Sequence, residues 1–313
     1  MGNSFSFAWE DRFILWLQQF MTDGLVKLAG FITNFGDELI LIGVIGLFYW
    51  SLNKALGKRL VVSLSFVNIV YPCIKTTVRR LRPYMANRNI QCLKAVSSEG
   101  DIYDVVSQEF SFPSGHANNC VAVYGTLANR AKSVLAMVGL ILLCLLVGLS
   151  RCVLGVHYPT DILAGWLLAC VCVSVYGLLE KALGRYHTYL LLDILGLAGF
   201  FIAETNDFYT GYGLLLGSTL GIVFEEKYVS FHETRNALRC ILRTAVGAGL
   251  FLGLNTLLKL PFSHEFLNSG TFLSFSVRAI RYAVLAFLLL GVYPMCFRWF
   301  DRKKPAGDEN AIP

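Results

Sequence analysis

Three short polar stretches of this 313-residue chain carry residue types that could bind a phosphate and transfer it. The first contains Lys75 and Arg82, the second contains His116, and the third contains His157 and Asp161. Fixed cations beside two histidines suit a site that stabilises a phosphoryl group and passes it through an imidazole. Each stretch stands where an apolar segment meets a polar one, so the flanking segments must bring the three together.

The first stretch, Lys75-Thr-Thr-Val-Arg-Arg-Leu-Arg82-Pro83, ends an apolar segment. Lys75, Arg79 and Arg82 follow an i, i+4, i+7 spacing, which predicts that they share one face of a helix that Pro83 closes. An arginine fork matches two phosphate oxygens, whereas a lysine acts as a point charge. A basic helix end that interacts with lipid headgroups is the alternative.

The second stretch, Pro113-Ser114-Gly115-His116, is expected to begin a helix, because proline suits an early helical position. Free backbone N–H groups at Ser114 and Gly115 would then face an anion at the positive end of that helix. An unperturbed histidine exchanges protons near neutral pH, so His116 is a candidate for proton transfer. The alternative is an ordinary interfacial histidine at a helix start.

The third stretch begins with Ser150-Arg151, and Arg151 is a further candidate for binding phosphate. Asp161 follows His157 by four residues, so it can accept the proton on one imidazole nitrogen and leave the other free to attack. A structural histidine–aspartate pair that caps a helix is the alternative. The occurrence of all three stretches in this order favours catalysis over the three separate alternatives.

The composition is typical of a membrane protein, with 55% hydrophobic and 15% charged residues, against about 25% charged in soluble domains. We therefore predict an all-α, polytopic transmembrane helical bundle. Residues 7–22 predict an interfacial helix, for which a short first span is the alternative. Nine spans are expected, at 24–50, 59–78, 116–130, 133–151, 160–180, 188–204, 208–225, 238–259 and 278–299.

The net charge of +6 is spread over short loops and segment ends, which is typical of membrane topology and argues against a nucleic-acid partner. With nine spans, these basic loops fall on one face, which we predict to be cytoplasmic together with the C-terminus. The three polar stretches and the N-terminus then lie on the non-cytoplasmic face. The expected protein is integral and multi-pass, in a bacterial plasma membrane and without a cleaved signal peptide.

The chain divides by function into three regions. Residues 1–183 hold the N-terminal helix and all three polar stretches, residues 184–300 add transmembrane helices without evident chemistry, and residues 301–313 form a polar cytoplasmic tail. The helices at 184–300 could widen a lipid groove, form a dimer contact or bind a regulator. No metal site is predicted, because the nine cysteines include no CxxC pair and the two histidines lack helical ligand spacing.

The three stretches resemble the motifs of the type 2 phosphatidic acid phosphatase superfamily, which includes vanadium haloperoxidases and glucose-6-phosphatases. The family pattern is Lys-x6-Arg-Pro, then Pro-Ser-Gly-His, then Ser-Arg-x5-His-x3-Asp. Residues 75–83, 113–116 and 150–161 match it without departure. The resemblance covers roughly residues 50–180.

The resemblance implies a role for each residue of the motifs. His157 would be the nucleophile that forms a phosphohistidine, Asp161 would orient it, and His116 would protonate the leaving oxygen. The phosphoryl oxygens would be held by Lys75, Arg82, Ser114, Gly115 and Arg151. Neither a metal nor another cofactor is expected. The loop between the first two motifs is long enough to cover a headgroup, and its candidate specificity residues are Tyr84, Arg88 and Tyr103.

A site at the membrane face suits a phosphorylated lipid: phosphatidic acid, phosphatidylglycerophosphate, an isoprenyl pyrophosphate or a sphingoid base phosphate. A nine-span plan is also similar to that of glucose-6-phosphatases, so a sugar phosphate is an alternative. Their last motif usually lacks the closing aspartate, and Asp161 therefore favours the lipid phosphatases. A non-catalytic membrane protein that binds lipid headgroups is a further alternative. Transfer to an acceptor alcohol and a homodimer are left open.

Overall fold

The structure is a computed structural model that describes residues 4–97 and 100–297. These residues form helices and loops and contain no strand, which confirms the all-α prediction. The longer helices are α1 (Ala8–Gln19), α2 (Asp23–Thr33), α3 (Glu38–Leu47), α4 (Lys54–Val78), α9 (Val134–Val153), α10 (Pro159–Leu183), α11 (Arg185–Ala198), α12 (Asn206–Phe224), α13 (Ala237–Leu257) and α15 (Phe272–Phe287). The short helices are α5 (Pro83–Ala86), α6 (Val105–Gln108), α7 (Gly115–Cys120), α8 (Thr126–Ala128) and α14 (His264–Leu267).

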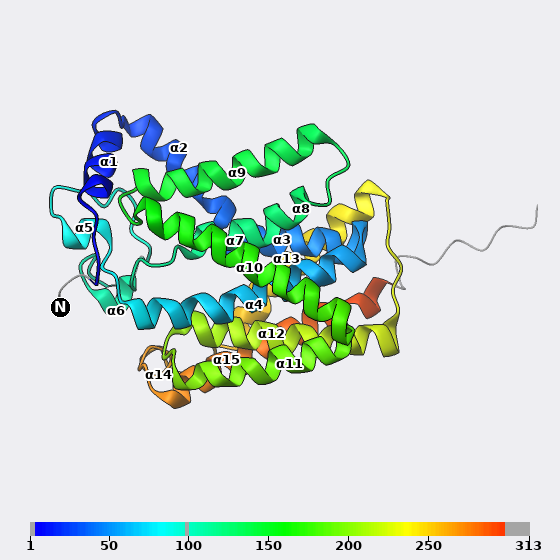
Figure 1. Cartoon of the computed structure of the whole chain (residues 1–313). Helices are drawn as coiled ribbons and strands as arrows, with labels where there is room; N and C mark the ends of the chain where they lie inside the picture. Colours follow the sequence, from blue (N-terminus) through cyan, green and yellow to red (C-terminus); the bar gives the residue numbers. More distant parts are fainter. Residues whose placement is uncertain (1–3, 98–99, 298–313) are drawn as a thin grey trace, which may run out of the picture.

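The long helices run side by side along the molecule, and α1, α5, α6 and α14 gather at one end of the bundle (Figure 1). Helix α4 lies between two hydrophobic cores. One core joins α4 to α3, α9, α10 and the segment Val121–Gly125. The other joins it to α11, α12, α13 and α15. Helix α4 therefore connects the motif-bearing half of the chain to the C-terminal half.

Helix α4 ends before the basic residues that follow it. Arg79 adopts a left-handed conformation with φ of 56°, and its Nε donates back to the carbonyl of Thr76. The prediction that Arg79 shares a helix face with Lys75 and Arg82 is therefore wrong, because the chain leaves the helix after Val78. Pro83 does not close α4 either, since it begins the separate helix α5.

Two glycines allow α12 to pack closely on both of its neighbours. A Cβ atom on Gly211 would overlap the backbone carbonyl of Asn68 in α4, and one on Gly217 would overlap the carbonyl of Ala283 in α15. Small residues let membrane helices approach backbone to backbone. The first turn of α12, with Asp207, is thereby held beside the end of α4 that carries Lys75.

Five helical segments of the described chain are long and apolar enough to cross a membrane. They are Lys54–Ala86, Val134–Val153, Pro159–Leu183, Ala237–Leu257 and Phe272–Cys296. The pair Asp23–Gly36 and Glu38–Leu52, bent by 50°, makes a sixth if it is counted as one span. The three other expected spans, 116–130, 188–204 and 208–225, are largely helical but shorter or less apolar. The count of nine spans therefore stays a prediction.

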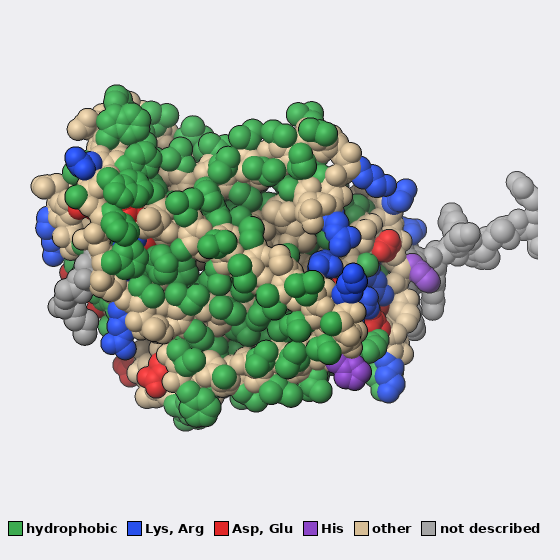
Figure 2. All heavy atoms as spheres, in the orientation of Figure 1, with side chains coloured by type: hydrophobic (Ala, Val, Ile, Leu, Met, Phe, Trp, Pro, Cys, Tyr) green, Lys and Arg blue, Asp and Glu red, His purple; other side chains and the backbone are tan. Residues whose placement is uncertain are grey.

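Hydrophobic side chains cover the middle of the molecule, the larger group of basic side chains lies at the end opposite α1 and α5, and further basic side chains lie at the α1 and α5 end (Figure 2). Several of these basic residues bind carboxylates: Lys54 Nζ lies 2.6 Å from Glu225, and Lys58 Nζ lies 2.6 Å from Glu226. The positive-inside rule counts lysine and arginine rather than net charge, so this pairing leaves the predicted cytoplasmic face unchanged.

Helix α1 lies across the motif end of the bundle, where the interfacial helix was expected (Figure 1). Trp9, Trp16 and Phe20 are exposed, whereas Glu10 is completely buried. The exposed aromatic rings suit a membrane interface, and the buried carboxylate anchors the helix to the bundle. The predicted tail at 301–313 lies outside the described residues.

Candidate active site

A cavity of about 690 Å³ reaches into the bundle from the end where the three motifs lie. Six of the predicted site residues line it, and five of them carry a charged or titratable side chain: Lys75, Arg82, His116, Arg151 and His157. The sixth is Gly115, at the start of α7. Three separate stretches of the sequence thus converge on one space that can hold an anion.

His157 stands in the link between α9 and α10, where Gly155 makes the turn with φ of 76°. Its Nε2 lies 3.3 Å from Nη1 of Arg82. Because a guanidinium only donates hydrogen bonds, this contact places a lone pair on Nε2 and the proton on Nδ1. Burial and then Arg82 hold the pKa of His157 well below its ordinary range. A neutral imidazole with this lone pair can act as a nucleophile, and that role for His157 stays a prediction.

Asp161, four residues after His157, is completely buried. Its Oδ2 is 3.5 Å from His157 Nδ1, which is longer than an ordinary hydrogen bond. The same Oδ2 accepts from the Tyr158 N–H at 2.8 Å, and Oδ1 accepts from Arg80 Nη1 at 2.6 Å. The carboxylate faces the imidazole but is held in place by other donors.

Arg80 is a site residue that the sequence interpretation missed. It is completely buried and bonded to both Asp161 and Glu10. Glu10, from α1, also accepts from the N–H and the hydroxyl of Thr160. A carboxylate inside the aromatic segment 7–22 was the signal that could have indicated this ion pair, since membrane-embedded charges are ordinarily paired.

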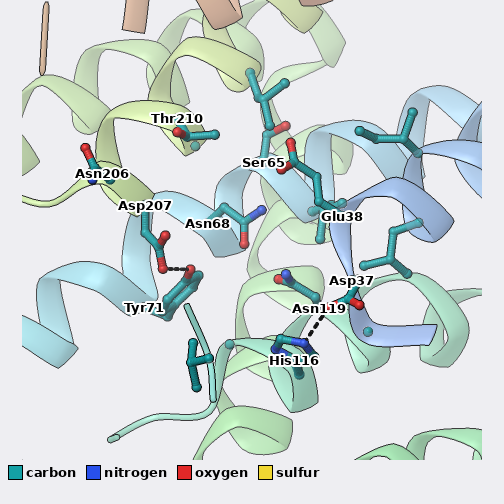
Figure 3. Close-up of a pocket in the computed structure, with 18 of the residues that line it drawn as sticks. Asp37, Glu38, Ser65, Asn68, Tyr71, His116, Asn119, Asn206, Asp207 and Thr210 are labelled. Carbon is teal, nitrogen blue, oxygen red and sulfur yellow. Dashed lines mark hydrogen bonds and ion pairs between the residues drawn. The ribbon is translucent and has the colours of Figure 1, made fainter. Parts of the chain in front are cut away.

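His116 is paired with a second carboxylate that the sequence interpretation did not identify. Its Nε2 lies 2.7 Å from Oδ1 of Asp37, at the bend between α2 and α3 (Figure 3). The Asp37 side chain is 44% exposed and lines the cavity. A histidine with a carboxylate partner beside an anion site can hold and release a proton.

Arg151 retains free hydrogen-bonding capacity. Its Nη1 donates to Thr33 Oγ1 at 2.9 Å, whereas Nε and Nη2 have no hydrogen-bond partner within the described part of the chain. The residue is only 3% exposed, so these N–H groups are unpaired inside the protein. Buried donors without partners are costly, and a phosphoryl oxygen in the cavity would satisfy them.

Arg82 is held mainly by backbone carbonyls. Its Nε donates to the carbonyls of Gln108 and Glu109, and its Nη1 donates to the carbonyl of Val156. Ser114 does not line the cavity; it caps α7, and its N–H donates to the carbonyl of Asp161 at 3.0 Å. Its position ties the second motif to the third.

The sequence matches the model of the PAP2 superfamily over residues 56–183. It also matches that of the PAP2 superfamily phosphatase, transmembrane extension, over residues 209–305. The chain belongs to the PAP2 superfamily. By family, it is a PAP2-type phosphatase and an integral membrane protein.

Curated relatives of this PAP2 protein are named as lipid phosphatases. Phosphatidylglycerophosphatase B of Bacillus subtilis is 29% identical over 164 residues, which are 49% of this chain and 70% of that protein. Undecaprenyl-diphosphatase of Sulfolobus acidocaldarius is 28% identical, over 45% of this chain and 64% of that protein. Sphingosine-1-phosphate phosphatase 1 of Rattus norvegicus is 28% identical, over 63% of this chain and 47% of that protein. No solved structure matches the chain.

In this PAP2 protein, Lys75 is already bound to two carboxylates. Its Nζ lies 2.7 Å from Glu109 Oε2 and 3.7 Å from Asp207 Oδ2. Asp207 also accepts from the hydroxyl of Tyr71 (Figure 3). Burial and then the neighbouring Asp207 raise the pKa of Glu109. The sequence interpretation saw no chemistry in 184–300, yet α12 places Asp207 beside a predicted phosphate-binding lysine.

The three candidate specificity residues lie close together on the loop that follows α4. The Tyr84 and Tyr103 rings lie 5.9 Å apart, and the Arg88 guanidinium lies 3.6 Å from the centre of the Tyr103 ring. None of the three is among the residues that line the cavity in the described chain. The loop reaches the cavity through other residues, including Val96, Ser107 and Glu109. A specificity role for the three residues stays a prediction.

Proposed function

We propose that this protein hydrolyses a phosphate monoester or pyrophosphate of a lipid through a phosphohistidine intermediate, without a metal. The observation that carries the proposal concerns Arg151, whose Nε and Nη2 are buried without a hydrogen-bond partner among the described residues. Arg151 and His157 line the same cavity. A site with cations for the phosphoryl oxygens and a neutral imidazole for attack has the two components that phosphoryl transfer needs.

The reaction would begin when the lone pair on His157 Nε2 attacks phosphorus. A P–N bond forms while the P–O bond to the lipid breaks, and His116 gives its proton to the departing oxygen. Water then attacks phosphorus, the P–N bond breaks, and His116 takes the proton from that water. Asp161 keeps the proton of His157 on Nδ1, with Arg80 as the residue that positions the carboxylate.

Charge on the transferring group would be stabilised by Lys75, Arg82 and Arg151, with the backbone N–H of Gly115 at the start of α7 as a further donor. Within the described residues, no three histidine, cysteine or acidic side chains are grouped so that they could hold a metal ion.

The proposed domain organisation follows the regions expected from the sequence. Residues 1–183 would form the catalytic core, and residues 184–300 would complete the bundle around it. The site would face the non-cytoplasmic side, because the basic loops gather at the opposite end. Its partners would be the lipid substrate and the membrane, and a homodimer stays open.

A sugar phosphatase is the second candidate, and the polar lining of the cavity is the observation that favours it. Glu38, Ser65, Asn68, Asn119 and Thr210 line the cavity beyond the cations (Figure 3). Hydroxyl groups of a sugar could bind such side chains.

The test is phosphate release by purified protein in detergent with a chelator present. The substrates are phosphatidic acid, phosphatidylglycerophosphate, an isoprenyl pyrophosphate, a sphingoid base phosphate and glucose 6-phosphate. We expect release from at least one lipid and an acid-labile phosphate on denatured wild-type protein that is absent from His157→Ala. Loss of activity with the chelator would contradict the metal-independent mechanism. Headgroup binding without any turnover would favour a binding protein.

A further inference from the structure

The cavity continues far beyond the cations. Along α4 it is lined by one face of the helix: Val61, Leu64, Ser65, Asn68, Tyr71 and Lys75. Fourteen residues separate the first from the last, which corresponds to about 21 Å at about 1.5 Å per residue. The space is therefore deep enough to hold much more of a substrate than its phosphate.

Beside the phosphate end, the cavity is surrounded by hydrogen-bond acceptors that lack partners. The Oδ1 atoms of Asn68 and Asn119 are buried without a hydrogen bond among the described residues, and the more exposed carboxylate of Glu38 lines the cavity beside them. Figure 3 shows these side chains pointing toward one space from α3, α4 and α7. Deeper along α12, the completely buried Ser218 also lines the cavity with an unpaired Oγ.

Unpaired buried acceptors need donors, and phosphate cannot supply them, because its ionised oxygens accept hydrogen bonds. A sequence of apolar carbons attached directly to the phosphate would leave these acceptors unsatisfied, at a cost in affinity. Hydroxyl or ammonium groups on the first carbons of the substrate would satisfy them. Two carboxylates, Glu38 and Asp207, favour such donors further.

The far end of the cavity is apolar. Its lining includes Leu41, Ile45, Trp50, Phe251, Leu285 and Leu289. Helix α12 of the C-terminal region lines both this apolar zone and the polar zone beside the phosphate end, and α13 and α15 line the apolar zone. An aliphatic chain fits this end, whereas a sugar would leave it unfilled.

We propose, on the basis of the proposed function, that the substrate is an amphiphile with hydroxyl or ammonium donors beside its phosphate and an apolar chain that reaches Trp50. The region 184–300 thereby determines specificity: α12 supplies Asp207 and Thr210 to the polar zone, α15 supplies Leu285 to the apolar zone, and the segment Leu288–Val292 that follows α15 supplies Leu289. An isoprenyl pyrophosphate has the chain but lacks the donors, and glucose 6-phosphate has the donors but lacks the chain.

The test is the affinity of non-hydrolysable phosphonates for the purified full chain, measured by titration in detergent. The sphinganine phosphonate carries an ammonium and a hydroxyl group, and the 1-acylglycerol phosphonate carries a hydroxyl group. Hexadecylphosphonate carries neither group, and the glucose phosphonate has hydroxyl groups but no apolar chain. We expect the first two to bind on the order of 10- to 100-fold more tightly than the other two. A preference for the first assigns the ammonium group, and equal affinity of the first two assigns the hydroxyl.

Variants locate the effect in the polar zone. Glu38→Gln and Asn68→Leu should each bring the affinity ratio of the sphinganine phosphonate to hexadecylphosphonate toward one. Glu204→Gln, which removes an exposed carboxylate near α12 that does not line the cavity, should keep the wild-type ratio. Equal affinity of wild type for hexadecylphosphonate and the donor-bearing phosphonates overturns this inference. Absence of turnover with an intact affinity order would overturn the proposed function alone.

Discussion

The two histidine–aspartate pairs of the site hold their carboxylates in opposite ways. Asp37 lies 2.7 Å from His116, and its side chain is 44% exposed to the cavity. Asp161 is completely buried, lies 3.5 Å from His157 and is bonded to Arg80 and the Tyr158 N–H. A carboxylate fixed by a buried arginine suits the orientation of a nucleophile. A carboxylate bonded to the histidine itself suits the transfer of a proton.

The largest effect is expected at the nucleophile. His157→Ala should lower turnover by about 10⁴-fold or more, because no other group can form the covalent intermediate. Phosphate release and trapping of labelled phosphate on denatured protein measure the change. A normal melting temperature in detergent shows that the variant folds. Trapped phosphate on this variant would place the nucleophile elsewhere.

His116→Ala should lower turnover of a lipid phosphate by about 10²- to 10⁴-fold, the range of general acid–base catalysis. The loss should shrink with p-nitrophenyl phosphate, because that leaving group departs without a proton. Parallel rate measurements on the two substrates provide the comparison. Equal losses on both would show that His116 binds the phosphate rather than protonating the leaving oxygen.

Arg80→Ala tests whether the buried His157–Asp161 pair, unlike the exposed His116–Asp37 pair, contributes to the stability of the folded protein. Removing one partner of a buried ion pair costs about 3–5 kcal/mol, and here Asp161 and Glu10 would both lose their arginine. Thermal unfolding in detergent measures the loss. Glu10→Gln together with Arg80→Met should recover part of it, since no unpaired charge from the Arg80–Glu10 pair then remains. An unchanged melting temperature in Arg80→Ala would contradict the positioning role.

Asp37→Asn tests the exposed pair, with a smaller expected effect. The charged hydrogen bond to His116 is lost, so turnover should fall by about 10- to 100-fold, while the melting temperature stays close to that of wild type. Asp23→Asn, on the neighbouring α2 but outside the cavity lining, is the matched control. A large loss of stability in Asp37→Asn would make the two pairs alike.

The smallest effect concerns pH and Lys75. The pKa of Glu109 is raised above its ordinary value of 4.5, so a falling pH neutralises it within a window above that value. Lys75 is then released for phosphate, and KM should fall a few-fold, about 2- to 5-fold. Because the folded protein binds this proton more tightly, stability from Glu109 also rises as the pH falls. KM profiles of wild type and Glu109→Gln provide the measurement; an unchanged slope in the variant would contradict this role.

The residues that perform the proposed chemistry could be identified from the sequence because each motif is local. The spacing from Lys75 to Arg82 and from His157 to Asp161 is fixed within one short stretch, and the apolar segments indicated a helical membrane bundle. Cavity-lining positions for Lys75, Arg82, His116, Arg151 and His157 follow those expectations. The details of helix ends did not, since the left-handed turn at Arg79 has no signal in residue type.

Only the tertiary structure decided which groups surround the motifs. Glu10 meets Arg80 from 70 positions away, and Asp37 meets His116 from 79 positions away. Asp207 reaches Lys75 because Gly211 lets α12 pack closely against α4. Such contacts depend on how helices pack rather than on local spacing, and a single sequence contains no direct measure of that packing. The sequence predicted the residues of the proposed phosphate end, and the helix packing decided which other side chains line the rest of the cavity.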